Sequence, residues 1–121
     1  MDSPRLALVR RLFEYMEQND VDGAVEHLLR HSAEDVVVQP YVAHGEEIRG
    51  HGPLREFWSR FADEGLQIRA GAYSISEEGD SVVVSGWLRT IDEGRLADTQ
   101  SRWVYRFNDR DQVVSARVER A

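Results

Sequence analysis

The first third of the chain carries apolar residues at helical spacing. Ser3 and Pro4 form a favourable helix start, because a serine side chain caps free N–H groups and proline suits the first helical position. The pattern predicts an amphipathic helix over residues 4–18 and a second over residues 21–31. The polar pair Asn19-Asp20 separates them and can cap the second helix. The two apolar stripes consist of Leu6, Val9, Leu12, Phe13, Met16, Ala24, Val25, Leu28 and Leu29.

A short strand and a third helix are predicted next. Residues 36–38 are a β-branched run that ends at Gln39-Pro40, which is typical of a strand. Residues 41–51 are predicted to form a loop, since glycines interrupt them. Gly52-Pro53 then opens a helix with a clear apolar face, formed by Leu54, Phe57, Trp58 and Phe61.

After Gly65 the hydrophobic period changes to two, which indicates strands. The segments between the strands are short and rich in turn-forming residues, so consecutive strands are expected to pair antiparallel. The four predicted strands cover residues 66–77, 81–91, 97–108 and 112–120. Three helices followed by such a meander predict one α+β domain over residues 1–121.

Composition excludes several function classes. The formal net charge of −7 argues against nucleic-acid binding, because phosphate recognition needs a basic surface. All 15 basic residues are arginine, so Schiff-base chemistry through lysine is impossible, and the absence of cysteine excludes disulfides and thiol nucleophiles. The N-terminal segment is too charged for a signal peptide and no long apolar run exists, so we expect a cytoplasmic protein without a membrane partner. We expect no cofactor and no metal site.

Four segments, in this order and spacing, resemble the nuclear transport factor 2 and ketosteroid isomerase superfamily, which includes SnoaL-like polyketide cyclases. They are Asn19 to Val25, the valine-rich strand before Pro40, Ile48-Arg49-Gly50 with the helix from Leu54, and the hairpin from Tyr105 to Ser115. The resemblance implies a cone-shaped fold, in which a curved antiparallel sheet carries the three helices of the N-terminal half on its concave face around an apolar pocket.

The catalytic positions of ketosteroid isomerases are all replaced in this chain. The resemblance places Gln39 where the family has its catalytic aspartate, Leu12 where it has the oxyanion-hole tyrosine, and Trp103 where it has a protonated aspartate. A glutamine amide can exchange hydrogen bonds but cannot act as a general base. The sequence therefore argues against the ketosteroid isomerase mechanism.

Strand alternation divides each strand into two faces. The resemblance implies that the apolar, aromatic face, on which Val114 and Ala116 are also expected, lines the pocket. Such walls are typical of small-molecule sites, although the same side chains could simply fill a core. We predict that a small apolar or aromatic ligand contacts Tyr41, Phe57, Trp58, Phe61, Leu88, Ser101, Trp103, Tyr105 and Val118.

Three residues are candidates for acid–base or hydrogen-bonding chemistry. His44 lies in the loop after the first strand, and its imidazole could carry a proton near neutral pH. Gln39 and Tyr15 could polarise a ligand carbonyl or hydroxyl group. The alternatives are an exposed loop histidine and a satisfied polar residue at the end of a strand.

The outer face of the sheet is predicted to carry Trp87, Arg89, Arg102 and Val104. Tryptophan and arginine are enriched at protein interfaces, and proteins of the superfamily commonly pair through this face, so we expect a homodimer.

Three functions remain open from the sequence. The first is an enzyme of the isomerase, cyclase or dehydratase type that works without the ketosteroid isomerase aspartates. The second is a non-catalytic ligand-binding module. The third is a dimerising scaffold whose pocket is filled by its own side chains.

Overall fold

The computed structural model describes residues 3–40 and 46–120. The helices are α1 (Pro4–Glu17), α2 (Val21–Arg30) and α3 (His51–Asp63). The strands are β1 (Ser32–Gln39), β2 (Ile48–Arg49), β3 (Gln67–Glu78), β4 (Ser81–Asp92), β5 (Arg95–Phe107) and β6 (Val113–Arg120). This arrangement confirms the α+β class and the three helices. It corrects two details: β1 begins earlier than its valine run, and β2 lies inside the predicted loop.

The helix starts follow the predicted capping chemistry. The backbone N–H of Leu6 donates to the Ser3 hydroxyl at 3.2 Å, with Pro4 as the first helical residue. At the start of α2 the backbone N–H of Gly23 donates to a carboxylate oxygen of Asp20 at 2.9 Å. Each cap satisfies an N–H group that has no partner within its helix, which fixes where the helix begins.

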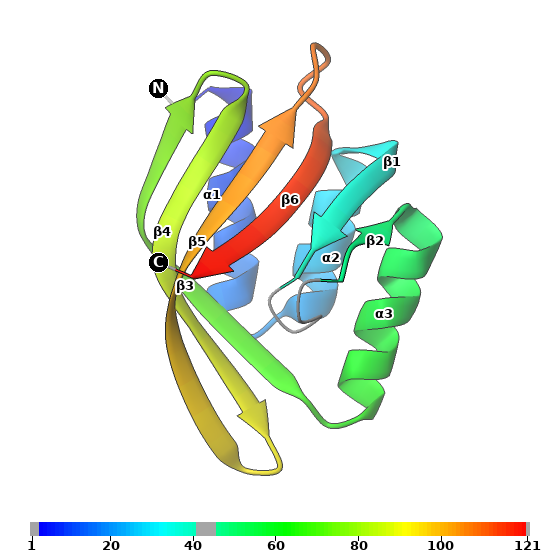
Figure 1. The fold of residues 1–121 in the computed structure, drawn as a ribbon, viewed down its shortest axis with the longest axis vertical. Helices are drawn as coiled ribbons and strands as arrows, with labels where there is room; N and C mark the ends of the chain where they lie inside the picture. The colour runs from blue at the N-terminus through cyan, green and yellow to red at the C-terminus, as the bar shows by residue number, and fades with distance from the viewer. Residues whose placement is uncertain (1–2, 41–45, 121) are drawn as a thin grey trace.

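The six strands form one sheet in the order β2-β1-β6-β5-β4-β3 (Figure 1). Strands β3 to β6 pair antiparallel as predicted. β1 joins the sheet beside β6 and runs parallel to it, with Val38 opposite Ala116 and Gln39 opposite Arg117. The parallel pairing brings the end of the first strand next to the last strand, two segments that are far apart in the sequence.

The sheet is curved, and the helices lie on its concave side. A break in the β3–β4 register between Ala72 and Ser74 marks a β-bulge, a feature that bends a strand. In Figure 1, α1 and α2 lie behind the strands and α3 lies beside β2. The core combines apolar residues of all three helices with those of β1 and of strands β3 to β6.

One alternation in β6 differs from the sequence prediction. Val113 is fully buried in the core, whereas Val114, which we expected on the pocket side, is half-buried. The β5–β6 register shifts between Arg106 and Phe107, so Phe107 pairs with Val113 and Arg106 with Ser115. Val114 falls at this irregularity and is therefore not on the buried face. The alternation of buried and exposed side chains resumes at Ala116.

Candidate functional site

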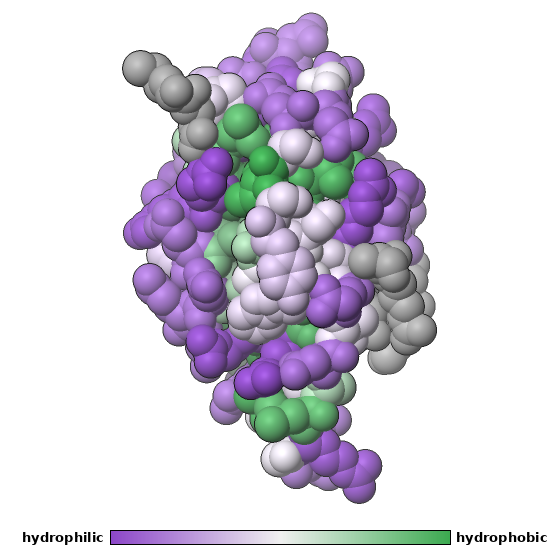
Figure 2. All heavy atoms as spheres, turned by 90° about the vertical axis from the view of Figure 1, so that its left-hand side faces the viewer, coloured by the Kyte–Doolittle hydropathy of each residue, from purple (hydrophilic) through white to green (hydrophobic). Residues whose placement is uncertain are grey.

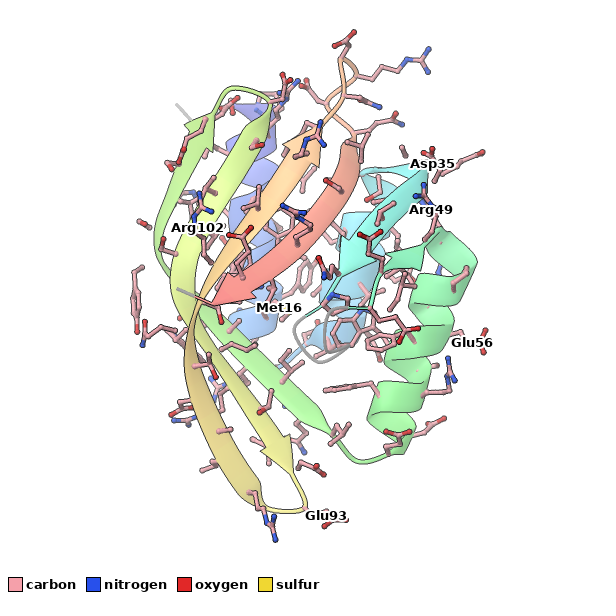
Figure 3. All side chains as sticks on the ribbon, in the orientation of Figure 1. Met16, Asp35, Arg49, Glu56, Glu93 and Arg102 are labelled. Carbon is pink, nitrogen blue, oxygen red and sulfur yellow. The ribbon has the colours of Figure 1, made fainter. Side chains whose placement is uncertain are left out.

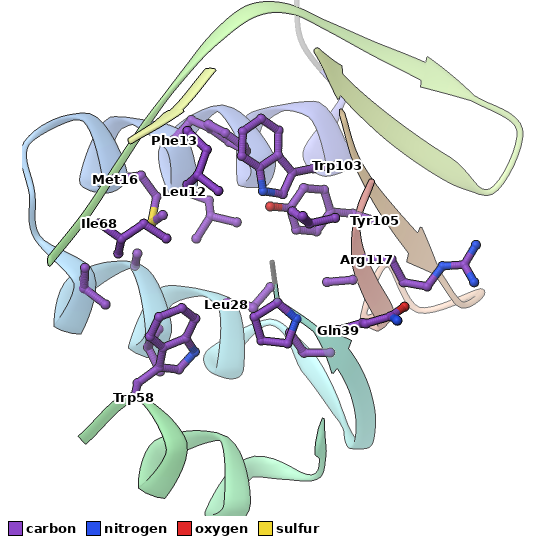
Figure 4. Close-up of a pocket in the computed structure, with 18 residues that line it drawn as sticks. Leu12, Phe13, Met16, Leu28, Gln39, Trp58, Ile68, Trp103, Tyr105 and Arg117 are labelled. Carbon is purple, nitrogen blue, oxygen red and sulfur yellow. The ribbon is translucent and has the colours of Figure 1, made fainter. Parts of the chain in front are cut away.

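A cavity of about 90 Å³ lies between the helices and the concave face of the sheet (Figure 4). Its wall is almost entirely apolar, which is typical of small-molecule sites. The lining residues are Leu12, Phe13, Met16, Val21, Ala24, Val25, Leu28, Val38, Gln39, Pro40, Trp58, Ile68, Leu88, Trp103, Tyr105, Ala116, Arg117 and Val118.

Two aromatic residues of β5 contribute to the sheet side of the cavity. Trp103 and Tyr105 are two residues apart on one strand, so their side chains share a face. Both rings pack edge-on against Phe13 of α1, with centroid distances of 4.9 Å and 6.4 Å. In Figure 4 the indole nitrogen of Trp103 and the hydroxyl of Tyr105 are turned toward the interior of the cavity. The apolar wall thus carries two hydrogen-bond donors.

The Tyr105 hydroxyl is strongly desolvated. The residue is only 5% exposed, and burial raises the pKa of its phenol well above the ordinary value. Burial is the sole cause of this rise, and none of the hydrogen bonds found within the described part of the chain compensates for it. A neutral phenol that is held in an apolar wall is suited to donate a hydrogen bond to a ligand oxygen.

The three positions that carry catalysis in ketosteroid isomerases do converge on this cavity. Leu12, Gln39 and Trp103 all line it. Gln39 lies at the rim, where Figure 4 shows its amide directed toward Arg117 and away from Trp58. Among the described lining residues there is no carboxylate and no imidazole. The described lining residues can therefore donate hydrogen bonds, but none of them is a carboxylate or an imidazole that could act as a general base near neutral pH.

Other predicted site residues lie elsewhere. Tyr15 faces the boundary between α1 and α2, where Arg11 lies over its ring at 4.4 Å and its ring centroid is 5.7 Å from that of His27. Phe57 and Phe61 border a separate surface pocket beside the end of β4. These three side chains do not line the cavity.

Ser101 is fully buried on the concave side of β5 but is not one of the lining residues. Its hydroxyl oxygen has no hydrogen-bond partner within the described structure. His44 and Tyr41, the remaining candidates, lie outside the described residues, so their predicted roles stay predictions.

The sequence reasoning missed the contribution that the apolar stripes of α1 and α2 make to the cavity. Met16, Val21 and Leu28 line it, as do Ala24 and Val25. A signal was present, because most of these positions belong to the apolar stripes of the first two helices, which were assigned to packing alone.

Two histidines lie side by side at the end of α2, His27 within the helix and His31 as its C-cap residue. His27 and His31 are one helical turn apart, and their ring centroids lie 5.0 Å from each other. The His27 Nε2 atom is 2.9 Å from the Leu8 carbonyl oxygen.

The part of the chain that the structure describes contains no group of three or more potential metal ligands. In the same part, every helix is too short or too polar to cross a membrane.

Solved structures with the same fold span almost the whole chain. An NTF2-like protein of unknown function from Burkholderia pseudomallei K96243 matches with a TM-score of 0.81 and 22% identity, over 99% of this chain and 92% of the other. TerC, co-crystallised with polyporic acid, matches with a TM-score of 0.77 and 20% identity, over 98% and 92%. A putative SnoaL-like polyketide cyclase from Jannaschia sp. CCS1 matches with a TM-score of 0.73 and 18% identity, over 98% and 89%.

The fold of this protein, an α+β domain with an apolar cavity between its helices and its sheet, is the fold of nuclear transport factor 2-like proteins. A family model for the SnoaL-like domain matches residues 9–116, and the chain belongs to that family. Members of the family bind small ligands or act as cyclases or isomerases. None of the curated proteins compared with the chain matches it significantly.

Proposed function

We propose that this protein binds a small, flat, largely apolar molecule that presents an oxygen acceptor to Trp103 and Tyr105. The observation that carries the proposal is the pairing of an apolar cavity with a buried tyrosine hydroxyl that is turned into it. An oxygen acceptor on the ligand would receive a hydrogen bond from the Tyr105 hydroxyl, and the apolar lining would pack against the ring of the ligand.

The cavity volume limits the ligand. About 90 Å³ is less than the roughly 150 Å³ of an engineered apolar cavity that holds benzene. Even a one-ring ligand therefore requires some lining side chains to move. Met16, which is labelled in Figures 3 and 4, is well suited to do so, because an unbranched thioether side chain adapts to irregular space.

Two structurally similar proteins support the ligand class. One was crystallised with polyporic acid, and the other is described as a putative polyketide cyclase. Isomerase, cyclase or dehydratase chemistry in this chain would need a proton carrier beyond the described lining residues. His44 is the predicted candidate, with Gln39 at the rim. We therefore propose binding as the primary role, with polarisation of a carbonyl by Trp103 and Tyr105 as the chemistry it offers.

The test compares acetophenone with α-methylstyrene, in which a methylene group replaces the carbonyl oxygen. Calorimetric titration of the purified protein is expected to show tighter binding of the ketone, because only the ketone accepts a hydrogen bond. Ala116→Leu, which fills part of the cavity, is expected to weaken both ligands. Equal affinities for the two compounds, or binding that Ala116→Leu leaves unchanged, would refute the proposed site.

We also propose that two copies pair through the outer face of the sheet. Tyr73 on this face is 66% exposed, and its hydroxyl accepts a hydrogen bond from the Gln100 amide at 3.3 Å. Figure 2, which views the molecule from the side of β3, shows weakly polar and apolar surface in the middle, bordered by hydrophilic residues. An aromatic centre with a polar border is the composition expected of an interface.

A further inference from the structure

Trp58 separates the cavity from a second, larger space. A groove of about 310 Å³ lies on the outer side of this residue, between the start of α2 and the end of α3. Trp58 and Val21 line both the groove and the cavity. The other residues that line the groove are Asn19, Asp20, Asp22, Phe61, Ala62, Gly65, Leu66 and Gln67.

The position of the Trp58 ring agrees with a role as a partition. The side chain is half-buried, and its ring meets Phe57 and Phe61 edge-on at 5.1 Å and 5.2 Å, both from its own helix. In Figure 4 the ring stands across the cavity from Trp103, at the end formed by α3. Val21, the other shared residue, is too small to close the same space alone.

We infer that the groove is the outer half of the ligand site, and that Trp58 is the movable wall between the two halves. The inner cavity alone is smaller than the roughly 300–1,000 Å³ usual for ligand pockets, whereas the cavity and groove together fall within that range. The ligand is then an elongated molecule. Its ring occupies the cavity and its tail passes Trp58 into the groove.

The groove also selects the chemistry of the tail. Asp20 and Asp22 are the charged residues among its described lining, and no cationic side chain accompanies them there. The Asp20 carboxylate already caps α2, so Asp22 is the freer of the two. Carboxylates repel an anionic tail, so the tail is a neutral alkyl or hydroxyalkyl chain rather than a carboxylate.

The partition can be tested without any ligand, because the chain has three tryptophans and Trp103 can be made the only one. Two double variants achieve this: Trp58→Phe with Trp87→Phe keeps an aromatic wall, and Trp58→Ala with Trp87→Phe removes it. Trp103 is 7% exposed in the folded chain. Acrylamide is expected to quench Trp103 several-fold more effectively in the alanine variant. Circular dichroism and thermal unfolding of both variants check that each is folded. Equal quenching in two folded variants would overturn the assignment of Trp58.

The tail assignment rests on the proposed function and has its own readout. Phenylhexanol is expected to bind the wild-type protein more tightly than phenylhexanoate, and Asp22→Asn is expected to narrow the difference. Equal affinities, or a difference that Asp22→Asn does not change, would overturn the placement of the tail. If neither compound binds while the quenching still differs, the proposed function fails and the partition stands.

Discussion

The carbonyl group of Gly71 in β3 lies directly against the α-carbon of Gly86 in β4, so closely that a β-carbon on residue 86 could not be accommodated. On the opposite face, the Trp87 ring covers Gly71 so closely that a β-carbon on residue 71 would collide with it. The two glycines sit beside the bulge between Ala72 and Ser74. Close backbone approach and a bulge together bend the sheet, and this bend creates the concave face that holds the cavity.

Gly86→Ala is expected to destabilise the fold. The new methyl group would collide with backbone rather than with a flexible side chain, and inserting a methyl group into a packed interior typically costs about 1–3 kcal/mol. Urea unfolding followed by circular dichroism measures the change. Gly52→Ala is the matched control, because a β-carbon there meets open space within α3. It should change the free energy of unfolding by less than about 1 kcal/mol, because the entropy gained on removing a glycine is offset by the restriction that Pro53 places on the residue before it. An unaltered stability of Gly86→Ala would contradict the close approach.

Tyr105→Phe separates binding from stability. In the unliganded protein the variant should be at least as stable as wild type, because burial desolvates this hydroxyl without a compensating hydrogen bond among the described residues. Acetophenone binding should weaken by about two- to tenfold, the range expected for one lost neutral hydrogen bond. Binding of α-methylstyrene should not change.

The control for this prediction is Tyr73→Phe, which removes a hydroxyl from a residue that is 66% exposed on the outer face. It should leave the affinity for both compounds unaltered. If the Tyr105→Phe variant still binds acetophenone more tightly than α-methylstyrene, the carbonyl oxygen of the ligand does not accept a hydrogen bond from Tyr105.

Periodicity was sufficient to predict the helices and the four-strand meander, because each depends on residues close together in the chain. It could not predict that β1 pairs with β6, since that register joins Val38 to Ala116 across most of the sequence. The burial of Val113 in place of Val114 depends on an irregularity in the β5–β6 register that no residue pattern marks. The sequence therefore predicts which side of a helix or strand is buried, but it does not predict where the alternation within a strand is interrupted.

The candidate site was predictable on its sheet side and less so on its helix side. Leu88, Trp103, Tyr105 and Val118 line the cavity as alternation implied. On α3 only Trp58 reaches the cavity, while Phe57 and Phe61 border other spaces. All three lie on one apolar face, and the rotation of the helix about its axis, which decides among them, is set by tertiary packing.

Stability should decrease on mild acidification through His31. His31 is an exposed residue, but partial desolvation of its imidazole, followed by the nearby charges of His27 and Arg30, lowers its pKa below the ordinary value. The unfolded chain therefore binds the proton at a higher pH than the folded chain does. The contribution is fully present above the ordinary pKa of histidine and is lost as the pH falls through it toward the lowered value.

The measurement is the free energy of unfolding between about pH 7 and pH 5, the range in which histidine titrates. His31→Gln should flatten the dependence on pH. An NMR titration of the wild-type protein should place the pKa of His31 below that of a free histidine. A pKa at or above the free value would contradict the prediction.

Trp87→Glu is expected to convert the proposed dimer into a monomer. Trp87 is half-buried against Gly71 in the single chain, and the neighbouring Tyr73 is exposed, so a facing copy would cover both rings. A carboxylate at the centre of such an interface would lose its hydration without gaining a cationic partner. This desolvation is strongly unfavourable and should prevent the two copies from associating. Light scattering over a range of protein concentrations measures the mass.

Ala62→Glu is the control for this substitution, because it adds the same charge at an exposed position of α3, on the helix side of the sheet. It should leave the dimer intact. Since Trp87 also packs on its own sheet, thermal unfolding must show that the Trp87→Glu monomer is folded before its mass is interpreted. A folded Trp87→Glu variant that dimerises with wild-type affinity would place the interface on another surface, and a monomeric wild-type protein would remove the dimer altogether.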